Sequence, residues 1–261
     1  MASRKNQREE LRARRVAAEN ARLERRRRQR LKMIGATIAA AVVVVVLAIV
    51  ISSTGGDTTL TKGKQAQQTV SEVQRLLAGI PQSGARLGNP KAPVTLVYYG
   101  DLECSACREF ALDGGFSRLL ANDVRSGVVQ VVFRNFETAT PDPHTFQTQQ
   151  VAALAAGQQS HFWDFAELFY RQQGAERTGY VTDDYLAGLA SQIPGFDMHS
   201  WQTARKDLSL VRQVISEEQA AGAAGIKGTP TLVFRGPRGS TEVPAAVPSY
   251  GQLQQVMQSV T

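Results

Sequence analysis

The sequence predicts an α/β domain that contains a helical insertion and follows a single membrane-spanning helix. Three observations support this fold class. Two short runs rich in β-branched residues, 94–99 and 128–133, flank a segment with helical spacing, as in a strand–helix–strand unit. Residues 140–222 keep a helical spacing of apolar residues, and an uncharged apolar run follows the basic amino terminus.

The first 52 residues combine a basic tail with an apolar run. Residues 1–32 hold 13 Lys and Arg against four Glu, a balance of +9, whereas the whole chain carries +7. Residues 33–52 are uncharged and long enough to span a bilayer, which takes about 20 apolar residues as a helix. Because basic flanks stay in the cytoplasm, we expect a cytoplasmic tail and an uncleaved signal-anchor in the cell membrane, with the rest of the chain outside.

Two alternatives apply to this region. A cleaved signal peptide has an apolar part of about 7–15 residues and a small-x-small cleavage site, and no convincing site follows Ile51. The Arg-rich tail is also compatible with a contact to nucleic acid or anionic lipid. We favour a topology determinant and expect no nucleic-acid partner.

After the anchor, the sequence divides into a linker over 53–83 and a compact domain over 84–261. The linker is polar and rich in Gly and Thr, and a short amphipathic helix is allowed over 70–77. The predicted elements of the domain are a strand over 94–99, a helix over 104–121 that bends at Gly114–Gly115, a strand over 128–133, the helical insert over about 140–222, a hairpin over 231–243 and a last helix capped by Ser249.

The only two cysteines, Cys104 and Cys107, follow the first predicted strand directly. In the first turn of a helix, residues i and i+3 lie about 5–6 Å apart, so a disulfide can form and break with little backbone movement. The positive end of the helix favours a thiolate on Cys104, which makes it the predicted nucleophile. Cys107 would then attack the mixed disulfide and release the product, in an oxidising compartment outside the cytoplasm.

A metal site and a pair of inert packed thiols are the alternatives to a redox pair. Zinc usually takes four ligands, and His144, His161 and His199 are not paired at ligand spacing. We favour the redox interpretation and expect neither a metal nor a cofactor.

Three charged residues beside the cysteines are candidates for tuning the thiol pKa values. Arg108 should favour a thiolate on Cys104, whereas Asp101 and Glu103 should oppose it, and the sign of the net shift stays open. Asp101 is also a candidate proton acceptor for Cys107 during resolution. The alternative for Asp101 is a solvated loop carboxylate.

Three stretches, GNPKAPVTLVYYGDLECSAC, FWDFAELFY and GIKGTPTLVF, occur in this order and extend over about residues 80–258. Together they resemble the DsbA-like, membrane-anchored thiol:disulfide oxidoreductases of the thioredoxin superfamily. The resemblance implies a thioredoxin-like fold and a cis peptide between Thr229 and Pro230 that faces the cysteines. An exposed backbone there pairs with an extended substrate strand, so Thr229 and Pro230 are the expected substrate-binding residues; an ordinary trans bond is the alternative.

The resemblance also implies that the helical insert caps the site and forms one wall of a groove. Trp163 and the neighbouring Phe residues are nevertheless better explained as core than as groove lining. One feature departs from the family pattern, because Ser105 and Ala106 stand between the cysteines where strongly oxidising members typically carry Pro and His. The direction of catalysis is therefore open.

We expect a disulfide oxidase that acts on exported, cysteine-containing polypeptides and is reoxidised by a membrane redox partner. A reductase or isomerase of the same fold is the enzymatic alternative. A non-catalytic chaperone or binding module is the other alternative, and it alone predicts that Cys104→Ser leaves function intact.

Overall fold

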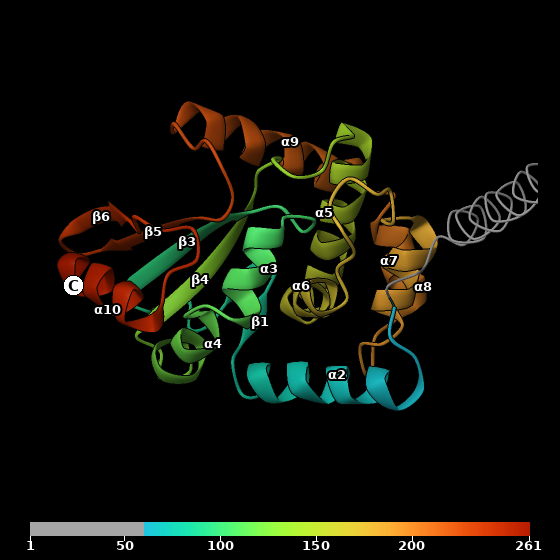
Figure 1. Ribbon diagram of the computed structural model, residues 1–261, viewed down its shortest axis with the longest axis horizontal. Helices are drawn as coiled ribbons and strands as arrows, with labels where there is room; N and C mark the ends of the chain where they lie inside the picture. Colours follow the sequence, from blue (N-terminus) through green and yellow to red (C-terminus); the bar gives the residue numbers. More distant parts are fainter. Residues whose placement is uncertain (1–59) are drawn as a thin grey trace, which may run out of the picture. The chain divides into compact units, whose positions relative to one another are not determined.

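The computed structural model describes residues 60–261 of the chain (Figure 1). The predicted basic tail (1–32), the predicted membrane helix (33–52) and the start of the predicted linker lie outside this range. Among the helices of residues 60–261, none is long and apolar enough to cross a membrane.

Six strands form one sheet in the order β1-β2-β4-β3-β5-β6. Their bounds are β1 (Gln82–Ser83), β2 (Arg86–Leu87), β3 (Val94–Gly100), β4 (Val129–Asn135), β5 (Thr231–Gly236) and β6 (Gly239–Glu242). The central strands β3 and β4 are parallel, whereas β5 pairs antiparallel with β3 and β6 with β5. The predicted strand–helix–strand unit and the predicted hairpin are both confirmed.

Strand β3 leads to the cysteines and is buried on both faces. Leu96 and Tyr98 belong to the main core, whereas Val97 and Tyr99 pack with Ala221 in a smaller cluster. Successive side chains of a strand point to opposite faces, so a strand covered on both sides consists of a nearly continuous apolar run.

One face of the sheet carries a helix broken into three pieces and the last helix of the chain (Figure 1). These elements are α3 (Ser105–Leu112), α4 (Phe116–Leu119), the π-helical turn η1 (Leu120–Val124) and α10 (Tyr250–Val260). At Gly114–Gly115, where a bend was predicted, the helix is interrupted between α3 and α4. A Cβ atom on Gly115 would lie 2.5 Å from the backbone nitrogen of Tyr250, so glycine lets α10 begin against the break. Ser249 caps α10 in a capping box with Gln252, as predicted.

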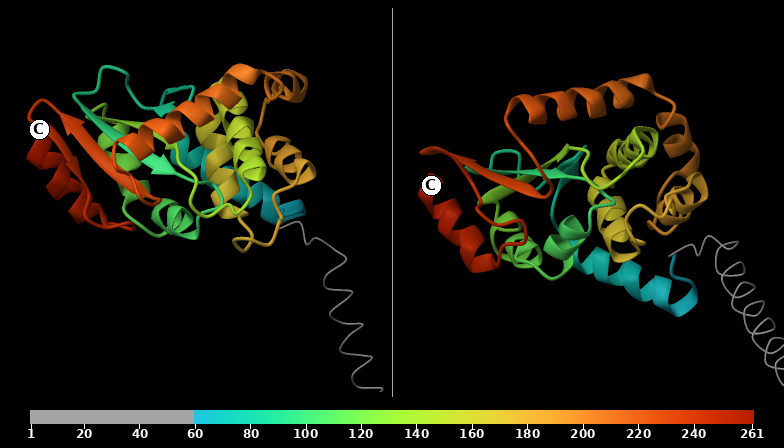
Figure 2. Two further views of the ribbon diagram at one scale, coloured as in Figure 1. Left: turned by 90° about the horizontal axis from the view of Figure 1, so that it is seen from above. Right: turned by 45° about the horizontal axis from the view of Figure 1, so that its top comes forward.

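The predicted helical insert lies between β4 and β5. Its helices are α5 (Pro143–Gly157), α6 (Phe162–Arg171), α7 (Asp183–Ala190), α8 (Met198–Ala204) and α9 (Leu208–Ala223). Helix α5 packs against α6, α8 and α9. Helix α9 then crosses the face of the sheet opposite α3 and α10 and contacts β4 (Figure 2). Trp163 and Phe169 of α6 are fully buried, which agrees with a core role for these aromatic side chains.

The linker region differs from its prediction. Residues 63–77 form helix α2 (Gly63–Leu77), which buries Val73 and Leu77 and packs against α6 and η1. Ile80 joins the same core, and strand β1 begins two residues later. From residue 60 onward the segment assigned to a linker is therefore part of the folded domain, because its apolar residues face a surface that the insert supplies.

Candidate active site

The two cysteines lie where β3 ends and α3 begins, and both are free thiols. Cys104 is the N-cap residue of α3, and its sulfur accepts a hydrogen bond from the backbone N–H of Cys107 at 3.4 Å. The Cys104 side chain keeps 6% exposure, whereas Cys107 is fully buried one turn further along. The pair therefore offers one sulfur to a substrate and holds the other inside.

The loop before β5 approaches the reactive sulfur from the opposite side. The Thr229–Pro230 peptide bond is cis, as the family resemblance implied, and the trans alternative is excluded. The Cys104 thiol donates a hydrogen bond to the carbonyl oxygen of Thr229 at 3.4 Å. The Thr229 hydroxyl in turn contacts the hydroxyl of Thr138, in the loop after β4. The structure thus joins two of the predicted site residues across 125 positions of sequence.

The two thiols have opposite pKa shifts. A hydrogen bond from the Cys107 side chain lowers the pKa of Cys104 from 9.0 to about 7, helped by hydrogen bonds from Thr229 and from the backbone of Cys107 and Ala106, while partial burial opposes the shift. Burial raises the pKa of Cys107 well above its usual value, and its hydrogen bond to Cys104 adds to that shift. At neutral pH, a large fraction of Cys104 is therefore thiolate, whereas Cys107 stays protonated.

Two buried tyrosines lie beneath Cys107. The Tyr98 hydroxyl donates to the Cys107 carbonyl oxygen at 3.4 Å and lies 3.4 Å from the Tyr170 hydroxyl. Burial raises the pKa of both tyrosines well above the usual range, so both stay neutral. The buried thiol therefore faces an uncharged environment with hydroxyl groups in it.

Asp101 has a different environment from either of those predicted for it. Its side chain is fully buried, which contradicts the solvated loop carboxylate. Oδ1 accepts hydrogen bonds from Glu103 N, Thr140 Oγ1 and Gln149 Nε2, and Oδ2 accepts from the N–H groups of Thr138, Ala139 and Thr140, all between 2.9 and 3.1 Å. A carboxylate has about four lone-pair sites, so these six donors already fill its capacity to accept hydrogen bonds. Asp101 instead connects the cysteine loop to the loop after β4.

The other two predicted tuning residues also have structural partners. Glu103 is 2% exposed; burial raises its pKa, and the nearby carboxylates of Asp101 and Glu176 add to this. The Arg108 side chain reaches α6 and donates from Nε to the Tyr170 carbonyl oxygen at 3.2 Å. Neither charge is among the main causes of the Cys104 shift, which come from hydrogen bonds to the sulfur.

Sequence reasoning missed a loop of the helical insert that contacts the cysteine turn. Gln173 Nε2 donates to the carbonyl oxygens of Leu102 and Cys104 at 2.7 and 3.1 Å. Arg177 N donates to a Glu103 side-chain oxygen at 3.1 Å, and Glu176 Oε1 accepts from Ser105 N at 2.6 Å. These partners lie 69 to 74 positions apart in the sequence, so no local spacing could have indicated them.

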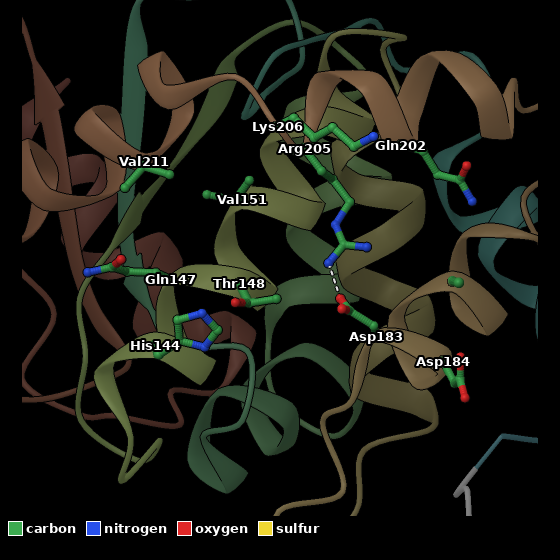
Figure 3. A pocket seen from close by; sticks show the side chains of 11 residues that line it. His144, Gln147, Thr148, Val151, Asp183, Asp184, Gln202, Arg205, Lys206 and Val211 are labelled. Atoms are coloured by element: carbon green, nitrogen blue, oxygen red, sulfur yellow. Dashed lines mark hydrogen bonds and ion pairs between the residues drawn. The ribbon is translucent and has the colours of Figure 1, made fainter.

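Two cavities bear on what the site can bind. One, of about 310 Å³, is lined by residues 228–231 and 242–246, and Thr229 in its wall also contacts the Cys104 sulfur. The other, of about 650 Å³, lies between helices of the insert and contains neither cysteine; an ion pair between Arg205 and Asp183 crosses it (Figure 3). Within residues 60–261, His, Cys, Asp and Glu form no cluster of three or more suited to hold a metal ion.

Comparison with known proteins agrees with this geometry. Residues 82–243 match the family model described as thioredoxin. A stretch of 151 residues is 25% identical to a probable disulfide bond formation protein D of Bacillus cereus and covers 58% of this chain and 69% of that protein.

A stretch of 153 residues is 31% identical to the Na(+)/H(+) antiporter NhaA 1 of Mycolicibacterium gilvum, covering 58% of this chain but 23% of the antiporter. The crystal structure of oxidised BdbD from Bacillus subtilis matches with a TM-score of 0.58 at 21% identity, over 70% of this chain and 96% of that one. The chain therefore belongs to the thioredoxin family and is a thiol:disulfide oxidoreductase.

Proposed function

We propose that this protein is a disulfide oxidase for exported, cysteine-containing polypeptides. One observation carries the proposal: Cys104 stands at the start of α3 and keeps 6% exposure, while its partner thiol Cys107 is fully buried. A disulfide whose exposed sulfur is a good thiolate leaving group is readily passed on to a substrate. The relatives named disulfide bond formation proteins support the same direction.

The exchange has two steps. A substrate thiolate attacks the Cys104 sulfur of the Cys104–Cys107 disulfide, so the S–S bond breaks and Cys107 leaves with the electron pair and takes up a proton. A second substrate thiolate then attacks the substrate sulfur of the mixed disulfide and releases Cys104 as a thiolate. The substrate dithiol loses two electrons, and the protein gains them as its own dithiol.

Thr229 and Pro230 are proposed as substrate contacts. The Thr229 carbonyl lies against the Cys104 sulfur, so an extended polypeptide that pairs with this backbone places its cysteine at the disulfide. The cavity of about 310 Å³ beside this loop is lined by Val243, Pro244 and two alanines, with Glu242 also in its wall. It has room for a small side chain of the bound polypeptide.

The proposed location is outside the cytoplasm, with the chain anchored through residues 33–52. The support comes from the sequence: the apolar run is long enough to span, and the basic tail before it favours a cytoplasmic amino terminus. In that compartment a membrane redox partner would take the two electrons and restore the disulfide. Protease treatment of intact and of broken cells tests the topology, because cleavage after residue 52 only in broken cells contradicts it.

A reductase or isomerase is the second candidate, and the pKa of Cys104 is the observation that favours it. A value of about 7 is close to that of thioredoxin, whereas the strong oxidant DsbA has a cysteine pKa near 3.5. The missing histidine between the cysteines, where Ser105 and Ala106 stand, agrees with a milder oxidant.

A glutathione redox titration of the full-length protein in detergent separates the two candidates. A potential of about −120 to −180 mV supports disulfide donation, whereas about −270 mV, as in thioredoxin, indicates a reductase. The Cys107→Ser variant is the control, since it cannot form the intramolecular bond. If the wild-type protein forms no Cys104–Cys107 disulfide at any ratio of glutathione, the redox function itself is wrong.

A further inference from the structure

The amino end of α3 is shared between two acceptors. The N–H groups of Ala106 and Cys107 point to the Cys104 sulfur, whereas the first N–H of the helix, that of Ser105, donates to Glu176 at 2.6 Å. Such a short contact is typical of a charge-assisted hydrogen bond to a carboxylate. The Cys104 thiolate and a glutamate of the helical insert therefore bind to neighbouring groups of one helix end.

The Glu176 carboxylate affects how readily the Cys104 thiol ionises. The amino end of a helix carries a partial positive charge, which stabilises a nearby thiolate. A carboxylate bound at the same end offsets part of that charge and also repels the thiolate directly. Glu176 must therefore oppose ionisation of Cys104, although the two residues are not neighbours in sequence.

We propose that Glu176 is a redox-tuning residue, which the helical insert places on the α3 amino terminus to weaken Cys104 as a thiolate and its disulfide as an oxidant. Glu176 acts through Cys104 and is a positioning residue rather than a catalytic one. The inference deepens the proposed thiol–disulfide function and rests on it. It also gives the insert a role beyond covering the site, because the insert then helps to set the redox potential.

Two further acidic residues and two arginines belong to the segments that meet at this helix end. Glu103 and Asp101 are acidic as well, and Glu176 and Asp101 both contribute to the raised pKa of Glu103, which shows how close the three carboxyl groups lie. The nearest cation on α3, Arg108, has its guanidinium on the Tyr170 carbonyl oxygen. Arg177 contacts this turn through its backbone N–H, which binds Glu103.

The test compares Glu176→Gln with Glu109→Gln in the reduced full-length protein. The amide introduced by Glu176→Gln keeps an oxygen that can accept from Ser105 N but loses the charge, while Glu109 is an exposed residue further along the same helix. We expect Glu176→Gln to lower the pKa of Cys104, followed by thiolate absorbance against pH, by about half a unit. The equilibrium constant for reduction by glutathione should rise about twofold at neutral pH, so the disulfide becomes a stronger oxidant.

Glu109→Gln should leave both quantities near their wild-type values. Glu176→Ala, which removes the acceptor as well as the charge, should lower the pKa at least as far as Glu176→Gln. A pKa that is unchanged or raised in Glu176→Gln overturns the proposal, as does a decrease seen in Glu176→Ala alone, because the effect would then come from the hydrogen bond rather than the charge. The thiolate pKa needs no disulfide, so this result stands apart from a failure of the protein to form one.

Discussion

The backbone N–H of Cys107 donates a hydrogen bond to the sulfur of Cys104 at 3.4 Å, and Cys104 keeps 6% exposure whereas Cys107 is fully buried. The interaction between the two thiol groups lowers the pKa of Cys104 and adds to the raised pKa of Cys107. The proposed roles of Cys104 as nucleophile and Cys107 as resolving thiol agree with this difference in burial and in pKa.

Alkylation of the reduced protein should therefore depend on pH through Cys104 alone. Only the thiolate reacts, and its pKa of about 7 places the midpoint of the rate near pH 7. Mass spectrometry after treatment with iodoacetamide should find Cys104 modified and Cys107 unmodified until the protein is unfolded. A midpoint near pH 9, the value of an ordinary thiol, would show that the sulfur is not stabilised as a thiolate.

The same shift predicts how the stability of the reduced protein varies with pH. A thiol whose pKa is lowered by folding contributes stability that is full above the unfolded value of 9.0 and is lost as pH falls through about 7. Cys107, whose pKa is raised by folding, lowers the stability of the folded protein, but only as the pH rises above 9.0. The free energy of unfolding of wild type minus that of Cys104→Ser should thus increase from pH 7 to pH 9, by about 2 kcal/mol. A difference that stays flat or decreases over this range contradicts the assignment.

Asp101→Asn should destabilise the protein strongly. Each carboxylate oxygen accepts three hydrogen bonds, so either orientation of the amide turns its NH2 group against three donors. Buried donors without an acceptor cost about 1–3 kcal/mol each, and we expect a total loss of about 2–4 kcal/mol in urea unfolding after local relaxation. Asp113→Asn, at an exposed position just after α3, is the control and should change stability little.

The hypothesis that Asp101 accepts a proton from Cys107 has a separate test, which is the rate at which Asp101→Asn resolves mixed disulfides. A rate equal to that of the wild-type protein removes the hypothesis.

Gly115→Ala should also destabilise the fold, for a steric reason. The added Cβ would lie 2.5 Å from Tyr250 N and 2.7 Å from the carbonyl carbon of Ser249, both backbone atoms, so α10 must move away from the helix break. Overpacking of this kind costs about 1–3 kcal/mol. Gly222→Ala in α9 has no atom within 4 Å of the new Cβ and should be neutral or slightly stabilising, since alanine favours a helix. Thermal unfolding of the two variants side by side measures the difference.

Local signals in the sequence predicted the elements that position the cysteines. The apolar run of β3, the paired glycines after α3 and the serine before α10 each act within a few residues, and the structure has all three. The cis bond before β5 was accessible only through the family resemblance, because an X-Pro pair in sequence does not determine its isomer.

Contacts between distant segments could not be predicted in this way. The insert loop of Gln173 and Glu176 reaches the cysteine turn only because α6 packs beside α3, which is a property of the tertiary fold. The role of Asp101 was missed for the same reason, since its donors come from three separate segments. The sequence allowed a short amphipathic helix over 70–77, but it did not indicate the start of α2 at Gly63 or its packing against α6 and η1, which depends on the tertiary fold.

Two substitutions of Cys107 can separate resolution from thiolate stabilisation. Cys107→Ser and Cys107→Ala both remove the resolving thiol. The Cys104 thiolate of either variant should attack the disulfide of an oxidised substrate, release one substrate thiolate and remain in the mixed disulfide. Serine keeps a hydroxyl that can donate to the Cys104 sulfur, whereas alanine leaves that sulfur without its strongest hydrogen bond. The pKa of Cys104 should therefore be higher in Cys107→Ala than in Cys107→Ser, with the alanine variant above 7. Equal pKa values in the two variants would mean that the helix and its backbone N–H groups, rather than the neighbouring side chain, set the acidity of the nucleophile.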